Sequence, residues 1–234
     1  MAFETVSKLM ENLKAQFPTD IISFREPVSK KVSVEINPQS IGRMTEHIFR
    51  GLGARFNSIV GVDRRPTHSD FQTTHVFSFD EEKIFVLLQS SLDKEHPELN
   101  SITSLIPGAS WAERELQDLL GIKVRGLNDA RRLVLPDDWP ENLHPLRRDF
   151  LYTCRPDPVK GAAPKPLDPP ENASVVPLGP FYPTLEEPAV FRLFVEGETV
   201  VGCDYRGFYN HRGIEKIADS ALTYNQIVFL AERI

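Results

Sequence analysis

Cysteine is scarce in this sequence: the 234 residues include two, Cys154 and Cys203. Neither belongs to a Cys-x-x-Cys pair, so the spacing predicts neither an iron–sulfur cluster nor a zinc site held by this chain alone. Two isolated thiols are typical of reduced cysteines in a cytosolic protein, and a disulfide between them is the alternative.

Long apolar runs and an excess of positive charge are also missing. No stretch approaches the ~18 apolar residues that span a bilayer, and residues 1–17 have no apolar core of a signal peptide. The net charge of −6 argues against a nucleic-acid partner, because binding to phosphates relies on an excess of Lys and Arg. A role at a membrane would therefore depend on other chains.

The composition that remains is that of a globular protein, with 41% hydrophobic and 26% charged residues. This length suffices for one large or two modest domains with a buried core. Residues 155–170 contain six prolines, which fix φ and remove amide donors, so we expect an extended linker there. The predicted organisation is a domain over 1–154, a linker over 155–174 and a second unit over 175–234.

Periodic hydrophobicity in the first domain predicts helices near 3–17 and 40–52 and strands near 21–24, 32–36, 55–62, 71–79 and 83–88. This order predicts an α+β fold, a mixed sheet with helices on one face. After the linker, strands at 191–195 and 199–203 form a predicted β-hairpin. An apolar stripe over 214–222 and a capping box at Thr223 and Gln226 then predict two helices.

The stretch 111–150 joins a predicted helix to an arginine-rich loop. Ser110 and Glu113 have the spacing of a capping box at the helix start, and Gly121 is suited to end the helix. Four apolar residues make one face, and the polar residues fall on the other, where we expect a solvent-exposed, salt-bridged docking surface rather than an acid–base pair. An ordinary amphipathic helix followed by a charged loop is the alternative. The apolar face contains Ala112, Leu116, Leu119 and Leu120. The polar face contains Glu113, Arg114, Gln117 and Asp118.

Spaced identities over residues 20–150 resemble the 30-kilodalton (C-type) subunit of respiratory complex I and its membrane-bound hydrogenase relatives. One departure is Leu127, since the family usually has a histidine after the second glycine. Four histidines of this part, His47, His68, His75 and His96, are scattered and fit no catalytic or ligand spacing. The matching residues are Gly61-Val62-Asp63, Ser101-Ile102-Thr103, Pro107-Gly108-Ala109, Glu113-Arg114-Glu115, Asp118, Gly121-Ile122, Arg131-Arg132, Leu135 to Trp139 and His144 to Asp149.

The resemblance implies that this first domain is a scaffold that docks neighbouring subunits. Arginine suits such contacts, because its planar guanidinium binds carboxylates and carbonyls at several points. The residues expected to dock other subunits are Glu113, Arg114, Glu115, Asp118, Arg131, Arg132, His144, Arg147 and Arg148.

The second unit resembles the start of the large subunit of group 4 nickel–iron hydrogenases, which is homologous to the 49-kilodalton (D-type) subunit of complex I. Complex I members usually have a quinone-site histidine where Tyr182 stands here, and hydrogenase relatives tend to have the Glu187-Pro188 pair. A C-type domain ahead of a D-type domain is the layout of the formate-hydrogenlyase large subunit. The other matching residues are Gly179-Pro180, Pro183, Gly197-Glu198, Tyr209, His211 to Lys216 and Glu232-Arg233-Ile234.

This second resemblance also implies site residues and cofactors. Glu187 would be the proton-transfer carboxylate beside the metal, a task that suits a desolvated acid. His211 and Arg212 would face the iron–sulfur cluster of a partner subunit. In the family the first pair of nickel thiolates follows Glu-Arg-Ile, so we expect the given chain to be a fragment. It would bind no metal alone, with the Ni–Fe centre completed in the full-length protein.

The sequence therefore predicts a subunit in the soluble arm of a formate-hydrogenlyase-like hydrogenase, which reduces protons to H2 with electrons from 4Fe–4S clusters. Its expected partners are a B-type iron–sulfur small subunit, a ferredoxin-like iron–sulfur subunit and membrane subunits. They would hold it in the cytoplasm at the inner face of the cell membrane. The alternatives are a C/D-type subunit of NADH:quinone oxidoreductase, or a non-catalytic assembly and docking module.

Overall fold

The computed structural model describes residues 5–181 and 187–232, and its chain divides into two compact units, Met1–Ala130 and Arg131–Ile234. Each unit is described by itself. This boundary falls earlier in the chain than the predicted boundary at residue 154, and residues 131–150 form several hydrogen bonds with later parts of the second unit. None of the helices in the described ranges has the length and apolar character needed to cross a membrane.

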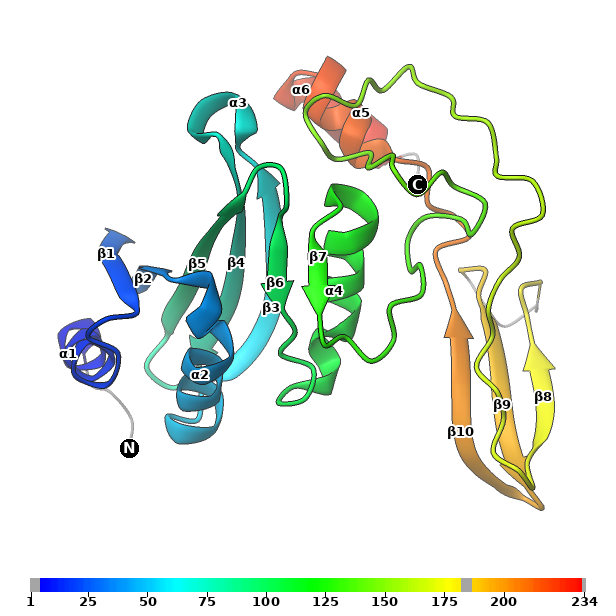
Figure 1. Cartoon of the computed structure of the whole chain (residues 1–234), viewed down its shortest axis with the longest axis horizontal. Helices are drawn as coiled ribbons and strands as arrows, with labels where there is room; N and C mark the ends of the chain where they lie inside the picture. The colour runs from blue at the N-terminus through cyan, green and yellow to red at the C-terminus, as the bar shows by residue number, and fades with distance from the viewer. Residues whose placement is uncertain (1–4, 182–186, 233–234) are drawn as a thin grey trace. The chain divides into compact units, whose positions relative to one another are not determined.

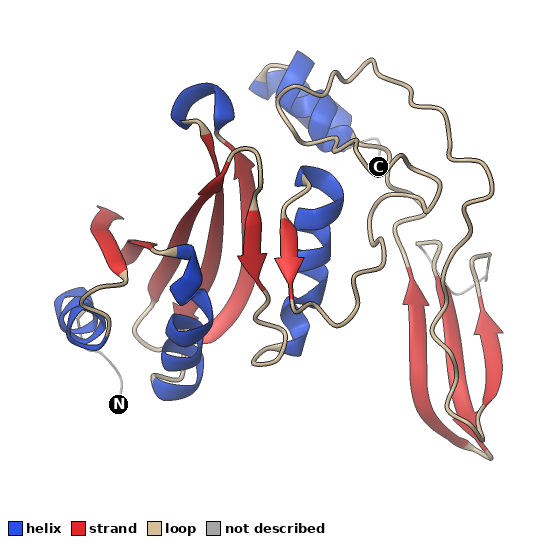
Figure 2. Cartoon of the chain, viewed as in Figure 1, coloured by secondary structure: helices blue, strands red, loops and turns tan. Residues whose placement is uncertain are grey.

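The first unit is built on a five-stranded mixed sheet with the strand order β1-β2-β5-β4-β3, shown in Figures 1 and 2. The pair β2–β5 is parallel and the other neighbours are antiparallel, as expected for a mixed sheet. A small parallel pair, β6 (Glu98–Asn100) and β7 (Lys123–Arg125), was not predicted. The five strands are β1 (Ile21–Val28), β2 (Lys31–Ile36), β3 (Arg55–Asp63), β4 (Asp70–Phe79) and β5 (Ile84–Asp93).

Three helices of this unit lie at predicted positions, with two irregularities, and a short helix over 65–68 was not predicted. α2 (Ile41–Glu46) and α4 (Ser110–Glu115) each continue into a π-helical turn, η2 (His47–Gly51) and η4 (Leu116–Leu120). A left-handed Gly121 with φ 67° ends the second of these, as predicted. The remaining helices are α1 (Val6–Gln16), α3 (Arg65–His68) and the 3₁₀ turns η1 (Pro38–Ser40) and η3 (Pro107–Ala109).

The core lies on one face of the sheet. Alternate residues of β2, β4 and β5 are buried, and the helices contribute the opposing apolar side chains. Gly61 on β3 allows the closest approach, because a Cβ atom there would lie 2.4 Å from Leu120 Cδ1 and 2.5 Å from Leu116 Cδ2. The other face of the sheet keeps Val60, Val62 and Phe85 exposed, so the helices cover a single face, as predicted.

The second unit contains an antiparallel sheet of order β10-β9-β8 and two short helices. β9 (Val190–Glu196) and β10 (Thr199–Arg206) form the predicted hairpin, whereas the strand β8 (Ser174–Leu178) was not predicted. The helices α5 (Ile214–Ala221) and α6 (Tyr224–Ala231) follow. As predicted for a capping box, Gln226 Oε1 accepts a hydrogen bond from the Thr223 amide at 2.9 Å. Residues 155–173 form neither helix nor strand, in line with the proline content.

Candidate functional site

The candidate site is formed by the turn between β10 and α5 in the second unit. Gly207 follows the strand directly, and the Tyr205 hydroxyl oxygen lies 2.2 Å from where a Cβ of Gly207 would be. Phe208 then takes a left-handed conformation with φ 64°, and its carbonyl accepts the His211 amide at 3.0 Å. Gly213, with φ 65°, precedes the first residue of α5. The turn thereby holds residues 208–212 on one side of the helix start.

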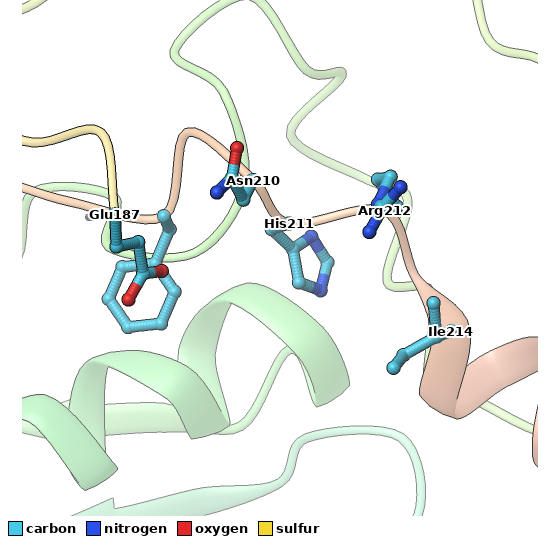
Figure 3. A pocket seen from close by; sticks show the side chains of 6 residues that line it. Glu187, Asn210, His211, Arg212 and Ile214 are labelled. Atoms are coloured by element: carbon cyan, nitrogen blue, oxygen red, sulfur yellow. The ribbon is translucent and has the colours of Figure 1, made fainter. Parts of the chain in front are cut away.

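A shallow hollow of about 200 Å³ lies beside this turn, and its lining includes all three residues singled out in the second unit. Figure 3 shows Glu187 at one end, Arg212 and Ile214 at the other, and His211 between them. His211 Nε2 lies 2.7 Å from Glu215 Oε1, one helical turn further on, so this ring is held in place. That contact also lowers the pKa of Glu215, against the opposing effect of burial. Phe208 and Asn210 complete the lining.

Glu187 is exposed in this structure, whereas a desolvated carboxylate was expected. Its electrostatic neighbour is Tyr205: burial raises the pKa of this phenol, and the negative charge of Glu187 raises it further. Tyr182, which together with Glu187-Pro188 was the basis for the distinction from quinone reductases, lies outside the described residues. The structure thus brings Glu187, His211 and Arg212 to one hollow, but it leaves Glu187 in contact with solvent.

Two contacts fix α5, and so the start of the hollow, to the His144–Asp149 segment. Lys216 is buried, and its Nζ donates to the Arg147 carbonyl at 3.0 Å. Asp219, which lies about one turn after Lys216 on α5, forms an ion pair with Arg148. The His144–Asp149 motif and the His211–Lys216 motif, which are far apart in the sequence, are therefore held together by these contacts. Lys216 had been noted as a matching residue, but nothing in the spacing indicated that it is buried or what it binds.

Asp204 on β10 organises the rest of the second unit, and sequence reasoning missed it. Its carboxylate accepts from Arg131 Nη1 at 3.0 Å, from Arg192 Nη1 at 3.1 Å and from the Leu167 amide at 2.9 Å. Burial raises the pKa of Asp204, but these hydrogen bonds and charges outweigh it, so the pKa lies below its usual value. Arg131 Nη1 also donates to the Lys165 carbonyl at 2.9 Å, so the proline-rich arm is tied down at this carboxylate.

Two of the arginines expected to dock other subunits, Arg131 and Arg132, make hydrogen bonds inside the second unit. Arg131 binds Asp204, and Arg132 Nη2 donates to the Trp139 carbonyl at 2.9 Å. The loop that carries them is held from β10 by Arg206, which donates to the Arg132 carbonyl at 2.6 Å and to the Leu135 carbonyl at 2.9 Å. Docking of partners through these side chains stays a prediction.

The polar side of α4 is buried, which corrects the expectation of a solvent-exposed docking surface. Glu113 is fully buried, and it accepts from Ser101 Oγ at 2.6 Å and from the Ile102 amide at 2.7 Å. Burial raises the pKa of Glu113, and these two hydrogen bonds oppose the rise. The Arg114 guanidinium lies 3.5 Å from the Asp129 carboxylate, and Arg114 is 5% exposed. Asp118 is buried as well, whereas Glu115 is exposed.

The predicted capping box at Ser110 is also wrong. Ser110 is the first helical residue rather than the cap, and the preceding residue makes no side-chain cap hydrogen bond. Glu113 is aimed instead at residues 101–102, where it satisfies a loop amide that would otherwise be buried without a partner. The carboxylate therefore holds the loop before the helix, not the first turn of the helix itself.

We expect Glu113→Gln to lower the free energy of unfolding by about 1–2 kcal/mol. Both carboxylate oxygens accept from donors, so an amide would place its NH2 group against one of them. Urea unfolding of the two proteins measures the difference, and Glu115→Gln, an exposed position on the same helix, is the control. Equal midpoints for wild type and Glu113→Gln would contradict the role of this carboxylate as a buried acceptor.

The described residues contain no group of three or more His, Cys, Asp or Glu side chains that could hold a metal ion. Cys154 and Cys203 are free and exposed. The side chains present in this part of the chain therefore do not fit a Ni–Fe centre or an iron–sulfur cluster, and no chemical step is assigned here to such a group.

Comparison with known sequences identifies the family. The profile described as "Respiratory-chain NADH dehydrogenase, 30 Kd subunit" matches residues 34–155, more than half of the chain. The chain belongs to this family. The sequence resemblance recognised over residues 20–150 is confirmed.

Three curated relatives extend the comparison. Hydrogenase-4 component G of Escherichia coli (strain K12) is 35% identical over 230 residues, which cover 97% of this chain and 41% of that protein. Formate hydrogenlyase subunit 5 of the same strain is 36% identical over 228 residues, or 95% of this chain and 40% of that protein. The C/D-type subunit of NADH-quinone oxidoreductase from Phocaeicola vulgatus is 32% identical over 169 residues, which cover 64% of this chain and 32% of that protein. The chain thus spans about two fifths of the length of the two hydrogenase proteins that it matches.

These comparisons define the class of protein. The relatives are named as parts of hydrogenase-4, formate hydrogenlyase and NADH-quinone oxidoreductase, and this chain is a member of the 30-kilodalton subunit family that they share with it.

Proposed function

We propose that the chain is the N-terminal part of a large subunit in a membrane-anchored nickel–iron hydrogenase of the formate-hydrogenlyase type. The complex would reduce protons to H2 with electrons from 4Fe–4S clusters in neighbouring subunits. The observation that carries this proposal is the extent of similarity, since the likeness to the two hydrogenase proteins runs through both units. The likeness to the relative from NADH-quinone oxidoreductase extends over a smaller share of the chain.

The hollow at the start of α5 is the proposed working site of this part of the protein. Glu187 would pass protons, because a carboxylate can accept and release a proton at little cost when its surroundings tune its pKa. The exposed side of Glu187 would then be covered in the assembled complex, which supplies the desolvation that this chain alone does not. His211 and Arg212 would face the partner's iron–sulfur cluster, where positive charge favours the reduced state.

The first unit and the 131–150 segment would serve as the scaffold on which the complex assembles. Its partners would be a B-type iron–sulfur subunit, a ferredoxin-like iron–sulfur subunit and membrane subunits that hold the complex at the inner face of the cell membrane. Glu115 and Arg148 are the exposed members of the predicted docking set. Contacts through Arg131 or Arg132 would add to, or exchange with, the internal bonds that these residues already make.

The test is Glu187→Gln, introduced into the protein in its native complex, with H2 evolution and co-purification of the partner subunits measured together. We expect loss of most H2 evolution from a complex that still assembles. Glu196→Gln, at an exposed glutamate that ends β9 in the same unit, is the matched control and should leave both readouts unchanged. A complex that assembles and evolves H2 at the wild-type rate would remove Glu187 from the proposed site.

Two other functions have an observation in their favour. The family match and the relationship to the C/D-type protein support a quinone-reducing complex, which would oxidise NADH with quinone and evolve no H2 in the same preparation. The exposure of Glu187 supports a purely structural docking module. In that case Glu187→Gln would leave turnover unchanged, whereas disruption of the scaffold would prevent assembly.

A further inference from the structure

Four polar side chains lie in the core of the first unit without a partner. They are Thr45 on α2, Thr73 and His75 on β4, and Ser90 on β5, and each residue is fully buried. Their hydroxyl groups and both ring nitrogens of His75 have no hydrogen-bond partner among the residues that the structure describes. Buried polar groups are almost always hydrogen-bonded, to protein or to ordered water, so a set of five such atoms in one unit needs an explanation.

The strand register places three of these side chains together. Thr73 and Ser90 are direct partners across the antiparallel β4–β5 pair, so their side chains lie on the same face of the sheet. His75 is two residues along β4 from Thr73 and therefore lies on this face too. The same face is the one that the helices cover, because Leu88, the partner of His75, is buried within the core.

Thr45 brings the fourth polar group from the helix side. It lies on the buried side of α2, between Met44 and Ile48, which are both fully buried. The 3₁₀ turn η1, directly before α2, packs against β5, so the helix starts beside the strand that carries Ser90. On the far side of β4, Gly61 is the register partner of Thr73 and is covered by Leu116 and Leu120. Apolar groups thus enclose the polar set from the β3 side.

The spacing suits a bridging molecule of the size of water. Cβ atoms of directly opposed residues in an antiparallel pair are about 5 Å apart, and a water can bond to two groups at about 2.8 Å each. A buried water needs two to four polar partners, and the two hydroxyls with the imidazole of His75 provide them. We propose that Thr73, His75 and Ser90 form a binding site for ordered internal water, closed from the helix side by Thr45.

Such a site joins α2 to the centre of the sheet through hydrogen bonds that no protein group supplies. It also decides which nitrogen of His75 carries the proton, because the imidazole donates from one nitrogen and accepts at the other. The proposal concerns the folded core of the first unit and does not depend on the proposed hydrogenase function.

The test is the sign of a stability change. Thr73→Val replaces the hydroxyl by a methyl group of similar shape. If ordered water joins the set, the variant breaks its network, and we expect the unfolding equilibrium constant of the full chain to rise at least fivefold. If Thr73 has no water partner, the variant removes a desolvated hydroxyl, and the unfolding constant should fall, which would overturn the proposal. Thr74→Val, on the opposite and half-exposed face of the same strand, is the control.

A double-variant cycle and a direct view of the water complete the test. Ser90→Ala should also raise the unfolding constant, and its effect combined with Thr73→Val should be smaller than the product of the two single effects, because both lose the same water. Independent effects would count against a shared water. If either variant fails to fold, a crystal structure of the wild-type chain at a resolution that shows ordered solvent decides the matter. Density within hydrogen-bond distance of at least two of the three side chains supports the site, and its absence there rejects it.

Discussion

Asp204→Ala should loosen the second unit and free the proline-rich arm, with a loss of about 2 kcal/mol in the free energy of unfolding. Removing the carboxylate leaves Arg131 and Arg192 side by side without their shared anion, and it deprives the Leu167 amide of its acceptor. Breaking a fully buried ion pair costs about 3–5 kcal/mol, but these arginines are 25% and 26% exposed, so water screens part of the effect.

Two measurements separate this outcome from a general destabilisation. Urea unfolding gives the loss of stability, and hydrogen exchange of the Leu167 amide reports directly on the arm, since this amide donates to the Asp204 carboxylate. We expect its exchange to quicken by more than the change in global stability accounts for. Asp168→Ala, an exposed aspartate next to Leu167 in the arm, should change neither quantity. An unchanged exchange rate at Leu167 in Asp204→Ala would show that the arm is held by other contacts.

Local periodicity predicted most of the fold because the strands β2, β4 and β5 of the first unit face the core on one side. The alternation at Val32, Val34 and Ile36 is the direct consequence, and the structure buries all three completely. The same argument failed on α4. A helical wheel places Glu113 and Arg114 away from the apolar stripe, but residues 101–102 and Asp129 cover that side as well. Periodicity identifies the apolar side of a helix but does not show whether its polar side faces solvent or another part of the chain.

The site in the second unit was predictable only through motifs. The resemblance singled out Glu187, His211 and Arg212, and the structure places all three around one hollow. Asp204 could not be found in this way, because it belongs to none of the matching motifs. Arg192 is its register partner in the β9–β10 hairpin, but Arg131 and the Leu167 amide reach it only because the 131–150 segment and the arm fold back onto β10, and no short window of residues encodes this long-range arrangement.

Acid should destabilise the first unit through His75, and this effect begins well above the range where carboxylates titrate. Burial lowers the pKa of His75 from 6.5 to about 3. A base whose pKa is lowered on folding binds fewer protons in the folded state, so stability falls as the pH drops below 6.5 and continues to fall toward 3. Between pH 6.5 and 5, His75 alone should remove about 1.5 kcal/mol from the free energy of unfolding.

His75→Leu isolates this contribution, because it keeps a buried side chain of similar volume without a titrating group. Burial also lowers the pKa of His47, so the wild-type protein should lose more stability than His75 explains, and the variant should keep that remainder. His96→Leu removes a histidine whose side chain is 89% exposed, and it should retain the wild-type slope. Urea midpoints at a series of pH values between 5 and 7 give the comparison. The same slope in His75→Leu and in wild type would mean that His75 gains a proton in the folded protein, and that solvent or a charge reaches the core beside β4.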